Sequence, residues 1–403
     1  MRSVDDQLAR VLDGVRPLNP IDMGLVDARG CILAEDVRAP WPLPPFDNSA
    51  MDGYAVAAAH LGEPTQSAPL RLKVIDDIPA GTRPRATVGP GTAARIMTGA
   101  PMPYGADAVV PVELTDGGMP VVTLFGGARV GQHVRRAGDD VHSGATVLNA
   151  GTIMEARQTA LAAAVGRSRV VIHPRPRVVV LTTGSELVEP GRQLGPGMIN
   201  DVNGSALAVA AAELGAEAFW VGPVPDDAEV FRNALEDQLV RADLVITTGG
   251  VSVGAYDTVK KVLSSLGTVE FVRVAMQPGM PQGHGHIAGV PIFNLPGNPV
   301  SAMVSFEVFV RPVLRRMLGF SDLVRPHVEA TVTQEFDSPL GKRQFARGQL
   351  VHTAEGYLFH PAAVQQSHQV AVLAHATGLA VVPEQVGHVV AGTRLPVAPF
   401  GVH

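Results

Sequence analysis

The fold is decided by a stretch in which an apolar run leads straight into a glycine turn: Arg177-Val178-Val179-Val180-Leu181-Thr182-Thr183-Gly184-Ser185-Glu186-Leu187. A short run of Val and Leu bounded by turn residues indicates a buried strand. Thr, Gly and Ser directly after it favour a tight connection to a helix. The stretch therefore predicts the first strand and the first strand-to-helix turn of an α/β domain.

The same order of strand, loop and helix repeats as far as Gly319. Such alternation predicts a mostly parallel sheet with helices on both faces. Asn298 and Pro299 form a good cap and first position for the last helix, and Pro312 is expected to kink it. The expected strands are residues 177–181, 218–221, 243–247, 269–275 and 290–294. The expected helices are about residues 203–214, 227–240, 256–266 and 299–318.

Three of the expected strand-to-helix loops combine glycine with Ser or Thr. In a doubly wound sheet such loops meet at the carboxyl ends of the strands, where ligands bind. Glycines let the backbone approach a phosphate, and helix N-termini aim N–H groups at it. The alternative is that the loops are only tight turns. The residues expected to bind the anion are Thr183, Gly184 and Ser185, then Gly249, Gly250, Ser252 and Gly254, and finally Pro296, Gly297, Asn298 and Ser301.

Acidic residues stand beside the same loops: Glu186, Asp226 and Asp257. Carboxylates beside a phosphate site repel the ligand unless a divalent cation bridges them, so these three are expected to hold Mg²⁺. Two alternatives stay open. Asp226 would serve only as a cap of the following helix, and Asp257 would only favour a helix dipole. Glu186 has no such local role.

The flanking regions are rich in short strands. Upstream, residues 45–56 read Pro-Phe-Asp-Asn-Ser-Ala-Met-Asp-Gly-Tyr-Ala-Val. They are expected to form an exposed loop on a rigid frame, where binding groups tend to sit. Residues 27–148 predict one or two small β-rich domains. After Gly319, short strand-like runs again alternate with Gly/Pro turns, which predicts a separate small β domain. A helix capped by Ser3 and another over about 154–165 are also expected.

Composition restricts the class of protein. The chain has 403 residues, of which 46% are hydrophobic and 17% charged, as in globular proteins with more than one domain. A net charge of −6 gives a nucleic-acid partner no electrostatic support. Cys31 is the only cysteine, which excludes an internal disulfide and a Cys-based zinc site. No apolar run approaches the roughly 20 residues of a membrane span, and no signal peptide is recognised, so a cytoplasmic location is expected.

Some common catalytic motifs are missing from the sequence. No Gly-Lys-Ser/Thr loop follows a strand and no dinucleotide fingerprint opens the α/β domain, so ATP hydrolysis and dinucleotide redox chemistry have no support. His284 and His286 are expected to be a loop pair with a structural or exposed role, because no third ligand stands nearby.

Six segments together resemble the molybdenum insertase family, that of bacterial MoeA and the E domain of gephyrin. The matching order runs from about Asp5 to Pro383. The segments are 46–56, 96–101 (Ile-Met-Thr-Gly-Ala-Pro), 135–140 (Arg-Arg-Ala-Gly-Asp-Asp), 183–187, 249–254 and 295–301. The first of them alone is highly specific.

The resemblance implies a multidomain α/β plus β fold. An elongated N-terminal domain would comprise residues 1–45 and 140–174, with a β-rich domain, 46–139, inserted into it. Residues 175–321 would form an α/β domain like molybdopterin adenylyltransferase, and 322–403 a small β-barrel. Family members are homodimers, with a cleft between the α/β domain of one subunit and the inserted domain of the other.

The implied reaction is the Mg²⁺-dependent insertion of molybdate into adenylylated molybdopterin, with release of AMP. Glu186, Asp226 and Asp257 match the family's acidic positions and would hold or orient Mg²⁺. Asp52 and Thr98 match positions that reach the cleft from the partner subunit. Arg343 and Ser367 resemble positions near the proposed molybdate pocket. Contacts with a molybdopterin adenylyltransferase and with molybdoenzymes are further expectations.

One segment departs from the family pattern. The family commonly has Lys-x-x-x-Lys-Pro-Gly-Lys-Pro where this chain has Arg273, Gln277 and Met280 in the corresponding positions. Arg273 keeps a charge and is expected to act in catalysis, but two cations beside the presumed anion site are gone. This loss leaves an alternative open, a diverged paralogue that carries molybdopterin and inserts metal weakly. A scaffold protein and an adenylyltransferase are further alternatives; the chain has no long linker for the first, and its β-rich segments disfavour the second.

Overall fold

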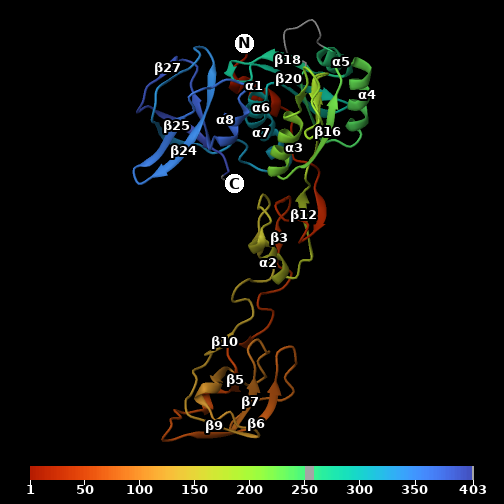
Figure 1. The fold of residues 1–403 in the computed structure, drawn as a ribbon. Coiled ribbons are helices and arrows are strands. Elements are labelled where there is room, and N and C mark those ends of the chain that lie inside the picture. Colours follow the sequence, from red (N-terminus) through yellow and green to blue (C-terminus); the bar gives the residue numbers. More distant parts are fainter. Residues whose placement is uncertain (250–257, 402–403) are drawn as a thin grey trace. The chain divides into compact units, whose positions relative to one another are not determined.

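A computed structural model gives the structure and describes residues 1–249 and 258–401. The chain forms two compact units (Figure 1). Unit 1 comprises Met1–Asp22, Gly30–Ala34 and Val171–His403, and unit 2 comprises Met23–Arg29 and Glu35–Val170. The four-domain division expected from the resemblance is finer than these units and stays a prediction.

Unit 1 contains the predicted α/β sheet, in the order β16-β13-β17-β21-β20-β18. The first four strands are parallel, and β20 and β18 run antiparallel at one edge. The predicted strands are confirmed to within a few residues, but β20 was expected to be a loop. The bounds are Arg177–Thr183 (β13), Glu217–Val224 (β16), Leu244–Thr248 (β17), Glu270–Arg273 (β18), Pro281–Ile287 (β20) and Val290–Leu295 (β21).

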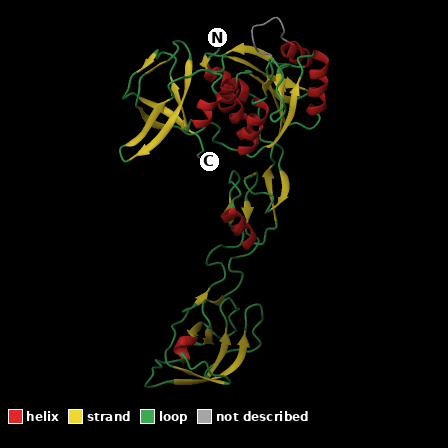
Figure 2. Ribbon diagram, viewed as in Figure 1, coloured by secondary structure: helices red, strands yellow, loops and turns green. Residues whose placement is uncertain are grey.

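Helices, which are red in Figure 2, cover this sheet. The expected single helix over 299–318 is divided into three parts, because a π-helical stretch, η3, replaces the α-helix just before Pro312. The bounds are Val4–Leu12 (α1), Asn203–Glu213 (α3), Ala228–Leu239 (α4), Thr258–Leu266 (α5), Pro299–Ser305 (α6), Phe306–Val310 (η3) and Arg311–Met317 (α7). As predicted, Ser3 caps α1, with its Oγ accepting from the Asp6 N–H at 3.0 Å.

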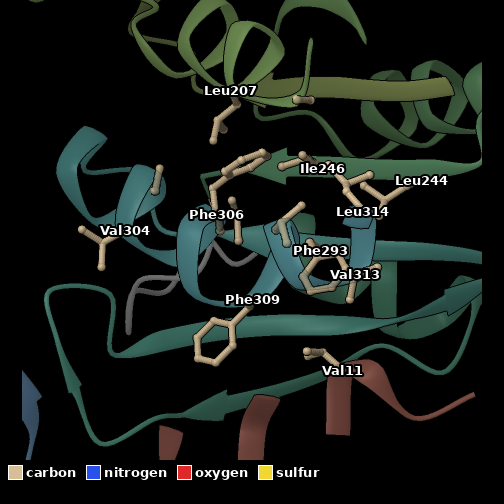
Figure 3. Packing of buried hydrophobic residues seen from close by; sticks show 14 of the residues in the cluster. Val11, Leu207, Leu244, Ile246, Phe293, Val304, Phe306, Phe309, Val313 and Leu314 are labelled. Carbon is tan, nitrogen blue, oxygen red and sulfur yellow. The ribbon is translucent and has the colours of Figure 1, made fainter. Parts of the chain in front are cut away.

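One large core cluster lies between the sheet and the helices α1, α3, α6, η3 and α7 (Figure 3), whereas α4 and α5 pack into a second cluster. Phe306 and Phe309 from η3 and Leu314 from α7 are buried in it, with Ile246 from β17. Val11 of α1 joins the same cluster. The amino-terminal helix is therefore part of the packing of unit 1, through the apolar stripe that its sequence presents every three to four residues.

The last part of unit 1 is a closed β-barrel. Its five strands pair in the ring β24-β25-β22-β28-β26, and β26 returns to β24. The bounds are Val328–Val332 (β22), Arg343–Thr353 (β24), Gly356–Pro361 (β25), Gly378–Val382 (β26) and Arg394–Pro399 (β28). Strand β19, Met276–Gln277, adds to β24, and helix α8 is Val370–His375. Ladder β23–β27 joins Phe336–Asp337 to His388–Val389, and β14–β15 joins Leu187–Val188 to Ile199–Asn200.

Unit 2 is β-rich, as predicted. Its main sheet has the order β8-β5-β7-β6-β9 and buries apolar side chains on both faces. The bounds are Gly53–Val56 (β5), Leu70–Ile78 (β6), Thr92–Ile96 (β7), Ala108–Pro111 (β8) and Val121–Leu124 (β9). Short ladders join Asn48–Ser49 (β4) to Val134–Arg135 (β10), and Val37–Arg38 (β3) to Thr146–Leu148 (β11). Helix α2, Ala156–Ala164, confirms the helix expected over 154–165, and η1 and η2 are 3₁₀ turns at Ala58–His60 and Val112–Leu114.

A further small sheet has the order β1-β12-β2, with bounds Ile21–Gly24, Arg169–His173 and Ile32–Leu33. Among the described residues, none of the helices has the length and apolar character needed to span a bilayer.

Candidate functional site

The three predicted loops meet at the carboxyl ends of β13, β17 and β21. The Thr183 hydroxyl donates to the Thr248 carbonyl at 2.9 Å, and the Gly249 N–H donates to the Leu295 carbonyl at 3.4 Å. The strands end side by side because they are parallel neighbours in the sheet. The convergence that the sequence predicted is confirmed for the described part of these loops.

Glycine is required where the loops approach most closely. Gly249 has φ of +99°, and a Cβ there would lie 2.5 Å from the Thr183 carbonyl oxygen. Only a residue without Cβ fits such a place. Gly297 lies against the same point, with its ideal Cβ position 3.8 Å from the Gly249 Cα. The backbones of the second and third loops thus lie in contact.

Two asparagines that the sequence analysis missed hold these glycines. Asn203 Nδ2 donates to the Gly297 carbonyl at 2.8 Å, and Asn294 Nδ2 donates to the Gly249 carbonyl at 3.2 Å. Both Oδ1 atoms are buried and lack a hydrogen-bond partner within residues 1–249 and 258–401. A buried acceptor without a donor is costly. The cluster therefore offers two acceptors to a ligand that carries N–H groups.

A buried carboxylate, Asp201, was also missed. It accepts from the Gly204 N–H at 3.1 Å, near the start of α3, and from the Thr182 hydroxyl. Asp201 is 1% exposed. An Asp three residues before a backbone N–H at a helix start is a common capping arrangement, which was the signal in the sequence. Asp201 thereby ties the end of β13 to α3.

Asp226 faces the first loop. Its Oδ2 accepts from the Ser185 N–H at 3.2 Å, and its own N–H donates to Ser185 Oγ at 3.2 Å. The neighbouring Asp227 caps α4, with its Oδ1 accepting from the N–H groups of Glu229 and Val230, both at 2.9 Å. The alternative that Asp226 serves as the cap of α4 is therefore wrong.

The structure describes only two of the three residues that were predicted to bind Mg²⁺. Glu186 and Asp226 are exposed on the first loop and on the segment bound to it. Asp257 lies outside the described residues, as do Gly250, Ser252 and Gly254. No group of three or more His, Cys, Asp or Glu suited to a metal ion occurs in the described part of the chain. Carboxylate oxygens nevertheless suit Mg²⁺, which is commonly held by one or two carboxylates and the substrate phosphates.

The third loop joins the barrel domain to the site. Asn298 precedes Pro299 at the start of α6, as predicted, but its side chain makes no capping bond. Its Nδ2 donates instead to Ser367 Oγ at 3.0 Å, and the Val300 N–H donates to the Ser367 carbonyl at 3.2 Å. Ser301 lies in the first turn of α6 and is 5% exposed, and Pro296 is buried beside Gly297. Asn298 and Ser367, which were predicted separately as binding residues, are thus in direct contact.

The predicted cations differ in their availability. Arg273 is exposed, with Nη2 3.4 Å from the sulfur of Met280. Arg343 forms a bidentate pair with Asp5, at 2.7 and 2.8 Å, and a third contact with Glu384 at 2.9 Å. The hydrogen bonds that Arg343 donates to Asp5 raise the pKa of Arg343 and lower the pKa of Asp5. The Arg343 guanidinium is therefore already paired with two carboxylates, those of Asp5 and Glu384.

In unit 2, Asp52 and Thr98 lie in direct contact. The Thr98 N–H and hydroxyl both donate to Asp52 Oδ1 at 2.7 Å. The Thr98 N–H and its hydroxyl hold the pKa of Asp52 below its ordinary value. The other acid of this segment, Asp47, is used internally, since it accepts from the Ala137 N–H at 2.8 Å and from Arg136 Nη1 at 2.6 Å. Of the two acids Asp47 and Asp52, it is Asp52 that is exposed.

The histidines expected in a loop are in strand β20. His284 is buried: its Nδ1 lies 3.1 Å from Gln7 Nε2, and its Nε2 lies 3.2 Å from Glu270 Oε1. Arg2 donates to the Gln7 side-chain oxygen, which fixes the amide orientation and makes Nδ1 of His284 the acceptor. His284 thus has the structural role that the sequence suggested, although the predicted loop was wrong.

Comparisons with known proteins agree with this arrangement. Three family models match: "MoeA N-terminal region (domain I and II)" over residues 2–166, "Probable molybdopterin binding domain" over 179–316, and "MoeA C-terminal region (domain IV)" over 329–400. "Molybdopterin molybdenumtransferase 2" of Mycobacterium tuberculosis is 49% identical over 98% of this chain and 99% of its own length. The Bacillus subtilis "Molybdopterin molybdenumtransferase" is 35% identical over 94% of this chain and 90% of its own.

A solved structure extends the similarity to three dimensions. The molybdopterin biosynthesis MoeA protein of Pyrococcus horikoshii superposes with a TM-score of 0.85 at 33% identity, and covers 100% of this chain and 99% of its own. The predicted multidomain α/β plus β architecture is confirmed. On its sequence and its fold, the chain belongs to the MoeA family, that of the molybdopterin molybdenumtransferases.

Proposed function

We propose that this protein is a transferase that inserts molybdate into adenylylated molybdopterin and releases AMP, with Mg²⁺ as cofactor. The observation that carries the proposal is the meeting of three glycine loops beside Glu186 and Asp226. Backbone N–H groups and close glycine backbones suit the phosphates of the substrate. The molybdenumtransferase names of the full-length relatives favour this enzyme over a molybdopterin carrier.

Different residues of unit 1 would bind different parts of the substrate and the metal ion. The loops with Thr183, Gly249 and Gly297 bind the substrate phosphates, while Asn203 and Asn294 offer acceptors to N–H groups of its ring system. Glu186 and Asp226, with Asp257, would hold Mg²⁺, which neutralises phosphate charge when bound. Ser301 and Ser367 stand at the third loop as further polar contacts.

We also propose that the protein works as a cytoplasmic homodimer. The argument is that Asp52 and Thr98 present an exposed, ionised carboxylate that the described part of unit 2 does not otherwise use. A second subunit would bring this pair to the loops of unit 1. An adenylyltransferase would supply the substrate, and molybdoenzymes would receive the product.

The test is a metal-insertion assay in vitro. Purified protein, adenylylated molybdopterin, molybdate and Mg²⁺ are expected to release AMP, with no release when molybdate or Mg²⁺ is left out. AMP release that needs neither component would contradict the proposal. Consumption of ATP with molybdopterin alone would instead identify an adenylyltransferase.

A further inference from the structure

Asp201 is a carboxylate buried in the α/β domain, with 1% of its surface exposed. Its two oxygens have different partners. Oδ1 accepts from the Gly204 N–H at 3.1 Å, and Oδ2 accepts from the Thr182 hydroxyl. Within residues 1–249 and 258–401, Asp201 makes no ion pair with a cation. A carboxylate withdrawn from water destabilises a fold unless hydrogen bonds compensate for the lost hydration.

Capping alone does not require a carboxylate in this place. A bond to the start of a helix can be made by an exposed Ser, Asn or Asp. Asp227 shows the exposed form at α4, where a single oxygen accepts both N–H bonds. Asp201 instead divides its oxygens between α3 and Thr182, near the end of β13. The second bond joins the helix to the strand that leads into the first loop.

The main chain around Asp201 holds the first loop. The Asp201 N–H donates to the Val188 carbonyl at 2.8 Å, and the Ile199 N–H donates to the Glu186 carbonyl at 2.9 Å. Both bonds adjoin the short ladder of β14 and β15. The main chain of Glu186, the exposed acid of the first loop, is therefore bonded to the segment that ends at Asp201.

The residues that follow Asp201 hold the third loop. Asn203 Nδ2 donates to the Gly297 carbonyl at 2.8 Å. Gly204 packs closely against β16, since a Cβ there would clash with the indole ring of Trp220. Helix α3 therefore begins at a fixed depth against the sheet, and Asn203 reaches the third loop from that place. One short segment thus contacts the first loop before Asp201 and the third loop after it.

We propose that Asp201 is a positioning residue for the reaction: it sets the distance between Glu186 on the first loop and Gly297 on the third. This inference rests on the proposed function and deepens it. A metal ion held by a carboxylate on one loop can bridge to a phosphate on another only where the spacing of the two loops is fixed. The role needs two correctly placed hydrogen bonds at position 201, and it does not need a negative charge there.

Three variants separate position from charge. Asp201→Asn keeps the shape and can satisfy both neighbours, because the Thr182 hydroxyl can accept a bond from the amide as well as donate one. Asp201→Ala removes both bonds, and Thr182→Val keeps the volume but removes the hydroxyl. Ser3→Ala is the matched control, since Ser3 makes the same kind of capping bond, at 3.0 Å, for the amino-terminal helix.

The measurement is calorimetric titration of the full chain with AMP, the product of the proposed reaction, in the presence and absence of Mg²⁺. In wild type, Mg²⁺ is expected to strengthen binding because it neutralises the phosphate beside the acids. This gain in affinity should fall about tenfold or more in Asp201→Ala and about fivefold in Thr182→Val, as lost hydrogen bonds predict. Asp201→Asn should keep the gain to within about threefold. Ser3→Ala should unfold at a lower temperature and keep the whole gain.

Several results would overturn the inference. If Asp201 were only structural, Asp201→Ala would unfold at a lower temperature and keep the full gain from Mg²⁺. If Asp201→Asn lost the gain as completely as Asp201→Ala, charge rather than position would matter. A wild type that gains no affinity from Mg²⁺ would equally refute the proposal. If Asp201→Ala does not fold, an unchanged gain in Thr182→Val is decisive.

Failure of this inference can be distinguished from failure of the proposed function, because the titration uses neither pterin nor molybdate. Molybdate-dependent AMP release by wild type, together with variants that keep the full gain from Mg²⁺, refutes only the role of Asp201. The expected pattern of Mg²⁺-dependent binding without molybdate-dependent AMP release refutes only the reaction.

Discussion

Glu186 and Asp226 reach the edge of the same loop by different local means, and this difference decides what each can do. Asp226 is held by two hydrogen bonds with Ser185, so its carboxylate is positioned before any ligand arrives. Glu186 is exposed, and its main-chain carbonyl, not its side chain, accepts from the Ile199 N–H. A free carboxylate beside a fixed one suits an ion that completes its coordination with substrate phosphates.

Glu186→Gln is therefore expected to reduce Mg²⁺-dependent AMP release by about tenfold or more, because one charged contact contributes about 1.5–3 kcal/mol. The matched control is Glu189→Gln, since Glu189 lies just beyond the same loop and pairs with Arg192 at 3.0 Å. AMP release measured against Mg²⁺ concentration should shift for the first variant and stay near wild type for the second. Equal behaviour of the two would remove Glu186 from the metal site.

Gln277 tests whether the missing lysines handicap this chain. It lies in β19, which adds to the barrel strand β24 with Gln277 opposite Gln344. If Arg273 or another cation of this chain already supplies the charge, Gln277→Lys should change the affinity for molybdate by less than about threefold. Titration of molybdate against both proteins measures this. A gain approaching 100-fold would mean that wild type lacks charge at this step.

At the scale of elements, the sequence predicted the central strands and loops well because their signals are local. A run such as Arg177–Thr183 followed by Gly184 needs no distant partner to be recognised. Strand β20 was missed for the opposite reason: Pro281–Ile287 contains two glycines and two histidines, and only its antiparallel neighbours β18 and β21 make it a strand. Strand propensity depends strongly on such context.

The same distinction holds for the candidate site. Glycine loops and acids were visible in the sequence, but Asn203 and Asn294 became recognisable only through their bonds to Gly297 and Gly249. Asn298 was expected to cap α6 and instead donates to Ser367, 69 residues away in the barrel domain. The sequence around Arg343 did not indicate its pairing with Asp5, because Asp5 lies near the other end of the chain. Local sequence patterns do not identify contacts between residues that are distant in the sequence.

The contact between loops gives a prediction at this scale. Gly249→Ala should lower the free energy of unfolding by about 2 kcal/mol or more, because its φ is strained for a side chain and its Cβ would lie 2.5 Å from the Thr183 carbonyl. Gly297→Ala is the matched control in the neighbouring loop, where the nearest atom is 3.8 Å away. Urea unfolding measures both. Comparable losses in the two variants would mean that the close approach at Gly249 does not exist.

At the scale of the whole molecule, the chain's first helix is fastened to the far edge of the sheet by a polar network. Arg2 binds Glu270 through two bonds, at 3.0 and 3.2 Å, and also Gln7 at 2.8 Å. Gln7 contacts His284, which in turn contacts Glu270. Residues from the start of the chain and from β18 and β20 are therefore held in one unit, while the Asp5 pair with Arg343 fixes the same helix to the barrel.

His284 makes this attachment sensitive to acid. Burial lowers its pKa to about 4, against an ordinary 6.5, and this outweighs the opposite effect of Glu270; Arg2, Arg10 and His286 add to the lowering. The unfolded chain therefore takes up a proton that the folded protein refuses, so stability falls as pH drops from 6.5 towards 4. The full effect is about 3 kcal/mol. Glu270, whose pKa is lowered chiefly by its hydrogen bond with Arg2, adds a loss only below about its ordinary 4.5.

Urea unfolding between pH 7 and 4.5 should therefore show decreasing stability in wild type and a flatter profile in His284→Gln. His60→Gln is the control, because His60 is an exposed histidine of unit 2 that takes no part in this network. The slope matters more than the absolute value, since replacing a buried side chain also changes packing at every pH. If wild type and His284→Gln lost stability in parallel over this range, the acid response would arise elsewhere, and His284 would already be protonated or solvated in the folded protein.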